Sequence, residues 1–182
     1  MELEEFKEEL LKKSKMINIE LNEEQINQFY TYMKMIQEWN EKINLTAILE
    51  PKEMILKHFI DSMTILDKIK ENDRVVDVGT GAGFPGIPIK IAKTNTDVVL
   101  LDSLNKRINF LNNIIEMLNL DKIQTVHARA EEFGSNVKYR ECFDVAISRA
   151  VAPMNILLEY LLPTVKVGGV CICMKGPDIE EE

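Results

Sequence analysis

Cysteine is scarce in this 182-residue sequence, where Cys142, Cys171 and Cys173 are the complete set. An odd number of cysteines without a C-x-x-C pair excludes a disulfide framework and a structural zinc site. We therefore expect no metal, and we interpret all three as small buried apolar residues in a reducing compartment. Long apolar runs are also missing, since none approaches the ~20 residues that span a bilayer. The first ten residues are acidic and amphipathic, unlike a secretory signal, so the sequence predicts a cytoplasmic protein without a membrane part.

Basic residues are fewer than acidic residues in this sequence. The sequence has 22 lysines and arginines against 30 acidic residues, for a formal net charge of −8. This balance argues against a protein that coats nucleic acid regardless of sequence, because such a protein needs a basic face. Binding of RNA through a local basic patch stays open, since net charge averages over the whole surface. The length and the 46% content of hydrophobic residues are typical of one globular domain with a small extension.

The character of the sequence changes near residue 72, and we expect a helical N-terminal extension over residues 1–71. Asn22 begins the segment N-E-E-Q, which is typical of a helix N-cap. The apolar residues that follow at helical spacing are Ile26, Phe29, Tyr30, Met33 and Ile36. A second helix is predicted to begin at Pro51. Its apolar residues are Met54, Ile55, Phe59, Met63 and Leu66. Residues 39–46 have no clean period and predict a structured connection.

From residue 72 to residue 182, short apolar runs alternate with helical patterns. The runs cover residues 75–78, 98–101, 123–127, 143–147 and 170–174, and helical patterns appear at 108–118 and 155–162. Continuous apolar strands separated by helices predict an α/β domain with a doubly wound, mostly parallel sheet. Ligands of such sheets bind beyond the carboxyl ends of the strands. The residues just after each strand are therefore the candidates for a site.

A glycine-rich turn, DVGTGAGFPG at residues 77–86, ends the first strand. A G-x-G-x-x-G pattern is formed by Gly81, Gly83 and Gly86. Taken alone, this pattern is typical of a dinucleotide site. Two features argue against that interpretation: the turn already begins at Gly79, and Asp77 at the strand end would repel a pyrophosphate. An acidic residue at this position favours a ligand that carries positive charge.

S-Adenosyl-L-methionine is such a ligand, because it carries a sulfonium and an ammonium group. Its ribose diol also needs a carboxylate acceptor, and Asp102 ends the second strand roughly 20 residues after the glycines, where a ribose-binding acid is expected. The adjacent Ser103 either contacts the ligand or caps the next helix. Arg129, Ala130 and Glu131 follow the third strand, where a backbone N–H and a carboxylate can meet the adenine edge. Three such features after three successive strands predict one crevice for this cofactor, and we expect Asp77, Gly81 and Gly83 of the glycine-rich turn to be among the residues that bind it.

Several further segments carry a resemblance to a known family. They are Trp39-Asn40 with Asn44-Leu45-Thr46, His58 with Asp61-Ser62, residues 77–86 and 101–103, Lys106-Arg107, residues 129–131 and residues 148–152. Together they resemble the class I S-adenosylmethionine-dependent methyltransferases and, more closely, the bacterial RsmG (GidB) family, which methylates guanine N7 in small-subunit ribosomal RNA. The resemblance implies that family's fold and cofactor, and small-subunit ribosomal RNA or its assembling particle as the partner. It also implies cofactor contacts at Gly79, Phe84, Asp102, Ser103, Ala130, Glu131 and Arg149.

Methyl transfer to guanine N7 is expected to need little from the protein beyond placing the two reactants. Guanine N7 has a free lone pair and requires no deprotonation. Methylation of cytosine C5 would need a thiolate, typically in a Pro-Cys pair, and the sequence has none. We expect Arg149 to face the base, the phosphate or the cofactor carboxylate; a surface ion pair is the alternative. For His58, a structural role is favoured over a catalytic one. Phe84 either stacks on a base or packs the pocket.

Contacts with RNA are expected from basic residues near the strand ends, namely Lys106, Arg107, Arg129, Arg149 and Lys175. Class I methyltransferases normally continue with two more strands after the fifth, and we expect this sequence to lack them, which would leave the domain at 72–182 incomplete at its C-terminus. We therefore expect residues 170–174 to form an exposed sheet edge, with little cover from the acidic tail at 178–182. Two other functions stay open. One is an RNA-binding or assembly protein with the same fold and no turnover, and the other is a methyltransferase that acts on a small molecule or a protein.

Overall fold

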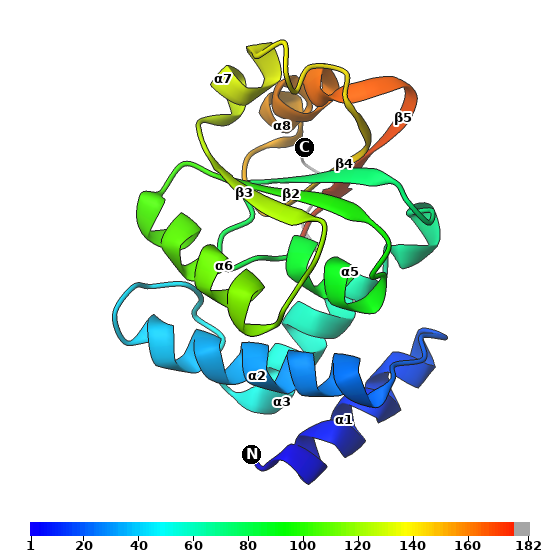
Figure 1. The fold of residues 1–182 in the computed structure, drawn as a ribbon, viewed down its shortest axis with the longest axis vertical. Helices are drawn as coiled ribbons and strands as arrows, with labels where there is room; N and C mark the ends of the chain where they lie inside the picture. Colours follow the sequence, from blue (N-terminus) through cyan, green and yellow to red (C-terminus); the bar gives the residue numbers. More distant parts are fainter. Residues whose placement is uncertain (177–182) are drawn as a thin grey trace.

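A parallel five-stranded sheet forms the centre of the computed structural model, which describes residues 1–176 (Figure 1). The strand order is β3-β2-β1-β4-β5, and every neighbouring pair is parallel. The strands are β1 (Arg74–Val78), β2 (Asp97–Asp102), β3 (Ile123–His127), β4 (Phe143–Arg149) and β5 (Val165–Met174). The order reverses beside β1, which makes the carboxyl ends of β1, β2 and β4 the topological switch point. The predicted doubly wound sheet is confirmed.

Helices cover both faces of the sheet. Helices α5 (Gly86–Ala92) and α6 (Asn105–Met117) lie on one face, and α7 (Ala130–Ser135) and α8 (Met154–Leu161) lie on the other (Figure 1). Two buried apolar clusters follow from this arrangement. The larger one joins the strands to α5, α6 and the N-terminal helices, and the smaller one lies under α7 and α8. Both faces of β1 and β2 are therefore buried, as their continuous apolar runs predict.

Helices α1 (Leu3–Met16) and α2 (Glu23–Asn40) form an N-terminal layer beneath α5 and α6 (Figure 1). The predicted N-cap is confirmed, because Asn22 and Gln25 form a reciprocal capping box. Gln25 Nε2 also donates to the carbonyls of Ile91 and Ala92 at the end of α5, 2.8 and 3.3 Å away. Helix α2 thus satisfies carbonyl groups that the last turn of α5 leaves free. The predicted boundary between the N-terminal extension and the α/β domain, at residues 71 and 72, stays a prediction. Buried residues from both sides of it belong to one apolar cluster.

The helix predicted from Pro51 does begin there, but it is not a regular α-helix. Helix α3 (Pro51–Met54) continues as the π-helix η1 (Ile55–Ile60) and then as α4 (Asp61–Met63), followed by the 3-10 turn η2 (Leu66–Lys68). The Asp61 N–H bonds to the Leu56 carbonyl, five residues earlier, which is the π-helical pattern. An apolar spacing of four residues suits the π turn as well as the α-helix, so the sequence pattern does not separate them.

Strand β5 lies at the edge of the sheet in the part of the chain that the structure describes. It begins at Val165, five residues earlier than predicted, and residues 166–170 are exposed. The expected open edge at residues 170–174 is confirmed for the described residues, since β5 pairs there with β4 alone; the side chain of Val170 is exposed and residues 171–174 are half-buried. The acidic tail at 178–182 lies outside the described residues. All three cysteines are half-buried, not fully buried as predicted.

Among residues 1–176, no helix combines the length and apolar character that crossing a bilayer requires.

Candidate functional site

A cavity of about 980 Å³ opens at the carboxyl ends of β1, β2 and β4. Its wall includes residues 79–82 and Phe84 of the glycine turn (residues 79–86), the ends of β2 and β4, and part of the π-helix η1. A second cavity of about 260 Å³ adjoins it, and the two share Gly79, Asp102, Ser103 and Val151 as lining residues. The site lies at the switch point of the sheet, where ligands of this architecture bind.

The glycine turn is tied to β2 through its backbone. The N–H groups of Gly79 and Thr80 donate to the Leu101 carbonyl, over 2.9 and 3.1 Å. Gly81 has a φ of +63°, and a Cβ placed there would meet no atom within 4 Å. Because Gly81 lines the larger cavity, its missing side chain leaves backbone open to a ligand.

Asp102 joins the glycine turn to the start of α6. Its Oδ2 accepts a hydrogen bond from Gly81 N at 3.0 Å and from Arg107 Nη1 at 3.4 Å, while Oδ1 accepts from Leu104 N at 2.9 Å. The bond to Leu104 N satisfies an N–H group at the beginning of the helix. Ser103 makes no such bond, so of the two roles left open for it, helix capping was wrong. Ser103 lines both cavities instead.

Asp77 lies behind the glycine turn and not in the cavity wall. Its side chain is fully buried, and Oδ2 accepts from Thr80 Oγ1 at 2.6 Å and from Gly86 N at 2.8 Å. Burial raises the pKa of this carboxyl group to about 6, and Oδ1 is buried without a hydrogen-bond partner. Gly83 is also part of this framework, since a Cβ there would lie 2.6 Å from Tyr32 Oη. Asp77 and Gly83 are thus the two predicted site residues that line neither cavity.

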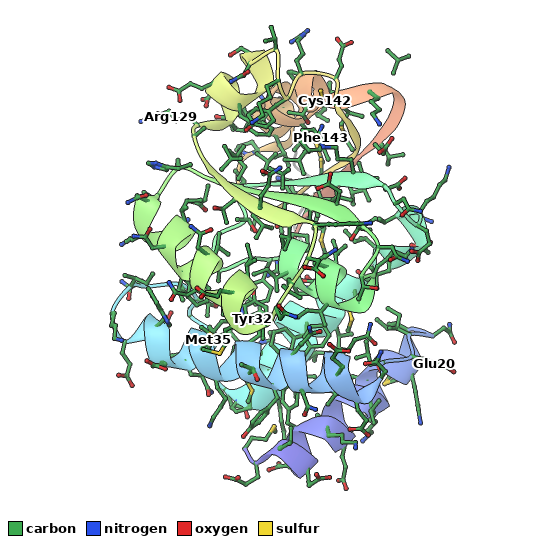
Figure 2. The ribbon with its side chains drawn as sticks, viewed as in Figure 1. Glu20, Tyr32, Met35, Arg129, Cys142 and Phe143 are labelled. Atoms are coloured by element: carbon green, nitrogen blue, oxygen red, sulfur yellow. The ribbon has the colours of Figure 1, made fainter. Side chains whose placement is uncertain are left out.

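Tyr32 supports the glycine turn from the N-terminal layer and was not among the residues predicted from the sequence. Figure 2 labels it on the side of α2 that faces the sheet. Its hydroxyl donates to the Ala82 carbonyl at 2.5 Å, and its ring lies 5.4 Å from that of Phe84. Burial raises the pKa of this hydroxyl well above its usual value, so it stays a donor. The signal was available: Tyr32 stands three residues after Phe29 and four before Ile36, on the same buried stripe.

Arg149 ends β4 and reaches across the cavity wall to η1 and α4. Its Nη1 donates to Asp61 Oδ2 at 2.9 Å and to the Lys57 carbonyl at 3.2 Å, and Nη2 lies 3.3 Å from His58 Nδ1. The guanidinium carbon is 5.0 Å from the centre of the Phe84 ring. An ion pair is therefore present, but the Arg149 side chain is only 17% exposed, so it is not a loose surface contact.

His58 is buried in the same wall. Its Nε2 is 2.9 Å from Thr46 Oγ1, and its ring stacks on Phe84 with centroids 4.4 Å apart. Burial, followed by the positive charge of Arg149, lowers the pKa of His58 to about 4. Phe84 is 5% exposed between these groups, so it packs the wall, which was the second of the two roles considered for it.

The smaller cavity holds the residues predicted after the third strand. Ala130 and Glu131 are in the first turn of α7 and line this cavity together with Arg129. Figure 2 labels Arg129 at the α7 end of the molecule, across the sheet from Tyr32. Around the two cavities, the structure thus brings together eight of the ten predicted residues, namely Gly79, Gly81, Phe84, Asp102, Ser103, Ala130, Glu131 and Arg149. Their roles in binding stay predictions.

The chain is similar to a large set of known sequences. A family model described as GidB, rRNA small subunit methyltransferase G, matches residues 25–182. A ribosomal RNA small subunit methyltransferase G from Acetivibrio thermocellus is 56% identical over 90% of this chain and 68% of its own length. The protein of the same name from Alkaliphilus oremlandii is 49% identical over 98% of this chain and 75% of its own length.

Solved structures agree on the fold. A SAM-dependent methyltransferase from Aquifex aeolicus has a TM-score of 0.53 at 21% identity and covers 71% of this chain and 74% of its own. The precorrin-6y C5,15-methyltransferase from Geobacter metallireducens has a TM-score of 0.51 at 14% identity, covering 72% and 65% of the two chains. At these identities the likeness shows the class I methyltransferase fold alone.

Proposed function

Because the chain belongs to the rRNA small subunit methyltransferase G family, we propose that it transfers a methyl group from S-adenosyl-L-methionine to guanine N7 of small-subunit ribosomal RNA. The observation that carries the proposal is the open cavity at the switch point, where Gly81 leaves backbone accessible beside the carboxylate of Asp102. A cavity of about 980 Å³ has the size of a small-molecule site.

The residues around the two cavities fit this cofactor. The position of a Cβ at Gly81 is empty, so a ligand can approach the turn, and Asp102 lines both cavities with a carboxylate suited to a ribose diol. Gly79 and Ser103 would hold the same nucleoside, with Ala130 and Glu131 at its adenine edge. Asp77 and Gly83 would act indirectly, by fixing the turn. When bound, the cofactor supplies an electrophilic methyl group on a sulfonium.

The protein contributes placement and electrostatics to the transfer. Guanine N7 presents an in-plane lone pair and loses no proton, so no general base is required. His58, with a pKa near 4 and both ring nitrogens engaged, is poorly suited to be one. No cysteine is among the residues that line the two cavities, which argues against a thiolate mechanism. Arg149, held at the wall, would orient the base or the cofactor in the reactive complex.

The RNA would approach over a small basic patch in an otherwise acidic protein. Lys57, Arg107, Arg149 and Lys175 line the larger cavity, and Arg129 lines the smaller one. Lys106, which we expected to contribute, lines neither cavity. Either the naked RNA or the assembling small-subunit particle is the substrate, and the cytoplasm, where both occur in bacteria, is the proposed location.

The experiment that tests this function offers one labelled cofactor to four acceptors. Methyl-labelled S-adenosyl-L-methionine is incubated with the protein and with unmethylated small-subunit RNA, small-subunit particles, total cell protein, or a small-molecule extract. We expect label in one or both of the first two acceptors. Label only in protein or small molecules would favour the other enzyme class, and RNA binding without any transfer would favour an assembly protein without turnover.

A further inference from the structure

A chain of side-chain contacts links the N-terminal layer to Arg149. The loop after α2 is held by Asn40, whose Oδ1 accepts from the N–H groups of Leu45 and Thr46 at 2.8 and 2.9 Å. Thr46 Oγ1 accepts from Ile48 N at 3.1 Å and lies 2.9 Å from His58 Nε2. The other ring nitrogen of His58 contacts Arg149, 91 residues away in the sequence. The position of the imidazole is thus fixed at both ends.

The contact with Arg149 determines which form of the imidazole is present. A guanidinium group has only donors, so His58 Nδ1 must be an acceptor in the contact of 3.3 Å. The proton of the neutral ring is therefore on Nε2, where it donates to Thr46 Oγ1. A protonated ring would place an N–H group against the guanidinium. Burial and then the charge of Arg149 lower the pKa of His58 to about 4 and outweigh the Lys57 carbonyl and Asp61, which favour the protonated ring, so the neutral form persists at neutral pH.

The other partners of Arg149 fix the plane of its guanidinium group less well than His58 does. Asp61 supplies opposite charge, but its side chain is 47% exposed, and the Lys57 carbonyl engages the same Nη1. His58 is 8% exposed, is packed on Phe84 and is the contact of Nη2. A long arginine side chain loses rotamer freedom when it is held, so a rigid second contact lowers the cost of presenting it in one orientation.

We propose that His58 is a positioning residue whose neutral imidazole, held by Thr46, fixes the guanidinium of Arg149 at the cavity wall for methyl transfer. This inference rests on the proposed function, since it assigns His58 a role in the same reaction. It also makes the loop after α2, whose Leu45 and Thr46 line the larger cavity, part of the active site. Both ring nitrogens are occupied, so the imidazole acts through Arg149 and not as a base.

Two isosteric variants separate the nitrogens of His58. His58→Asn keeps an acceptor near the position of Nδ1, whereas His58→Gln keeps a polar group near Nε2 and removes the acceptor that faces Arg149. We expect His58→Gln to lower kcat by about 100-fold, the cost of a group misplaced by about an ångström, and His58→Asn to stay within about tenfold of the wild type. Combining His58→Gln with Arg149→Ala should reduce kcat no further than Arg149→Ala alone.

A spectroscopic measurement gives a readout that a merely structural role would not move. The chain has two histidines, so a His127→Gln variant assigns the imidazole signals of His58 without ambiguity. Nitrogen-15 NMR at pH 7 should show an unprotonated Nδ1 and a protonated Nε2, and Arg149→Ala should shift the Nδ1 signal. Circular dichroism and thermal unfolding of each variant check that the fold is retained.

Three results would overturn the proposal. One is an NMR signal that shows a proton on Nδ1 of His58, and another is a double variant whose kcat is lower than that of Arg149→Ala alone. The third is a folded His58→Asn variant whose kcat is as low as that of His58→Gln. If the wild-type protein transfers no methyl group to RNA, the proposed function is wrong, but the contact between His58 and Arg149 is not disproved. The NMR experiment then still decides whether His58 accepts a hydrogen bond from Arg149.

Discussion

The carboxylate of Asp102, at the end of β2, connects the glycine turn to the start of α6. It accepts hydrogen bonds from the glycine turn and from the start of α6, and it lies 3.4 Å from Arg107. With 3% of the residue exposed, most of its surface is already used by the protein. A ligand that also hydrogen-bonds to this group therefore meets an acceptor that is already fixed in place.

Replacing Asp102 should weaken cofactor binding. We expect Asp102→Ala to cost about 1.5–3 kcal/mol of binding free energy for S-adenosyl-L-methionine, the scale of a hydrogen bond to a charged group. Isothermal titration calorimetry measures this, with Asp97→Ala at the opposite end of β2 as the matched control. The same titration should detect no binding of NAD. An unchanged affinity in Asp102→Ala would remove this residue from the site.

The ionisation of His58 should appear in the stability of the protein. The pKa of His58 is about 4 in the folded state and about 6.5 when unfolded, so the unfolded chain binds more protons between these values. The stabilisation is complete above pH 6.5 and is lost as the pH falls toward 4. Asp77 acts in the opposite direction: its folded pKa of about 6 lies above the ordinary value of 3.8, so its contribution falls as the pH rises between the two.

Urea unfolding at several pH values tests this balance. Relative to His58→Asn, the wild-type protein should gain up to about 3 kcal/mol of unfolding free energy between pH 4 and pH 6.5. Asp77 is present in both proteins, so its opposite contribution cancels in this comparison. Parallel pH profiles for the two proteins would show that the folded state leaves the pKa of His58 near its usual value.

At the scale of elements, the glycine turn is shaped by what lies on each side of it. Tyr32 and Asp77 hold it from behind, while Gly81 faces the open cavity. Gly168 in β5 offers a close comparison. It has a φ of +84°, and a Cβ there would also meet no atom within 4 Å, but it does not line the cavity.

Substituting these two glycines separates backbone strain from ligand contact. Gly81→Ala and Gly168→Ala should each lower the free energy of unfolding by about 1–2 kcal/mol, because both place a Cβ in the left-handed region. Only Gly81→Ala should also weaken the binding of S-adenosyl-L-methionine, by at least tenfold, since its methyl group enters the cavity. Equal affinities in the two variants would mean that the cofactor does not approach the turn at Gly81.

The elements also show what the sequence could and could not predict. The buried strands were evident because their apolar runs are continuous, and the capping box at Asn22 was evident because it is local. The π-helix was missed because its apolar spacing is compatible with an α-helix. Asp77 was expected in the cavity because it ends a strand, but the side chain of a strand residue points to one face or the other, and here it is buried behind the turn.

At the scale of the whole molecule, the N-terminal layer and the sheet share one core. Trp39, the single tryptophan, packs edge-on against Phe110 of α6 with ring centroids 5.5 Å apart. Gln28 of α2 donates to the Leu118 carbonyl at the end of the same helix. Sequence periodicity predicted helices on this side but not their partners, because an apolar stripe shows which residues are buried and not what they pack against.

A shared core predicts that the two parts unfold together. Trp39 fluorescence reports the contact between α2 and α6, and far-ultraviolet circular dichroism reports all helices and strands. We expect coincident urea transitions by the two probes, which is the behaviour of one cooperative unit. S-Adenosyl-L-methionine at 100 times its Kd should stabilise both by about 2.7 kcal/mol. A fluorescence transition at lower urea than the dichroism transition would show that the N-terminal layer unfolds separately.

For the molecule as a whole, we propose that this cavity directs a methyl group to guanine N7 of small-subunit ribosomal RNA. The most direct measurement treats unmethylated small-subunit RNA with the protein and S-adenosyl-L-methionine, digests the RNA and identifies the methylated nucleoside by mass spectrometry. A second portion is cleaved chemically at 7-methylguanosine to locate the position in the RNA. We expect 7-methylguanosine at one position, strongly reduced with Asp102→Ala and retained with Asp97→Ala. A different methylated nucleoside, or full methylation by the Asp102→Ala protein, would contradict the proposal.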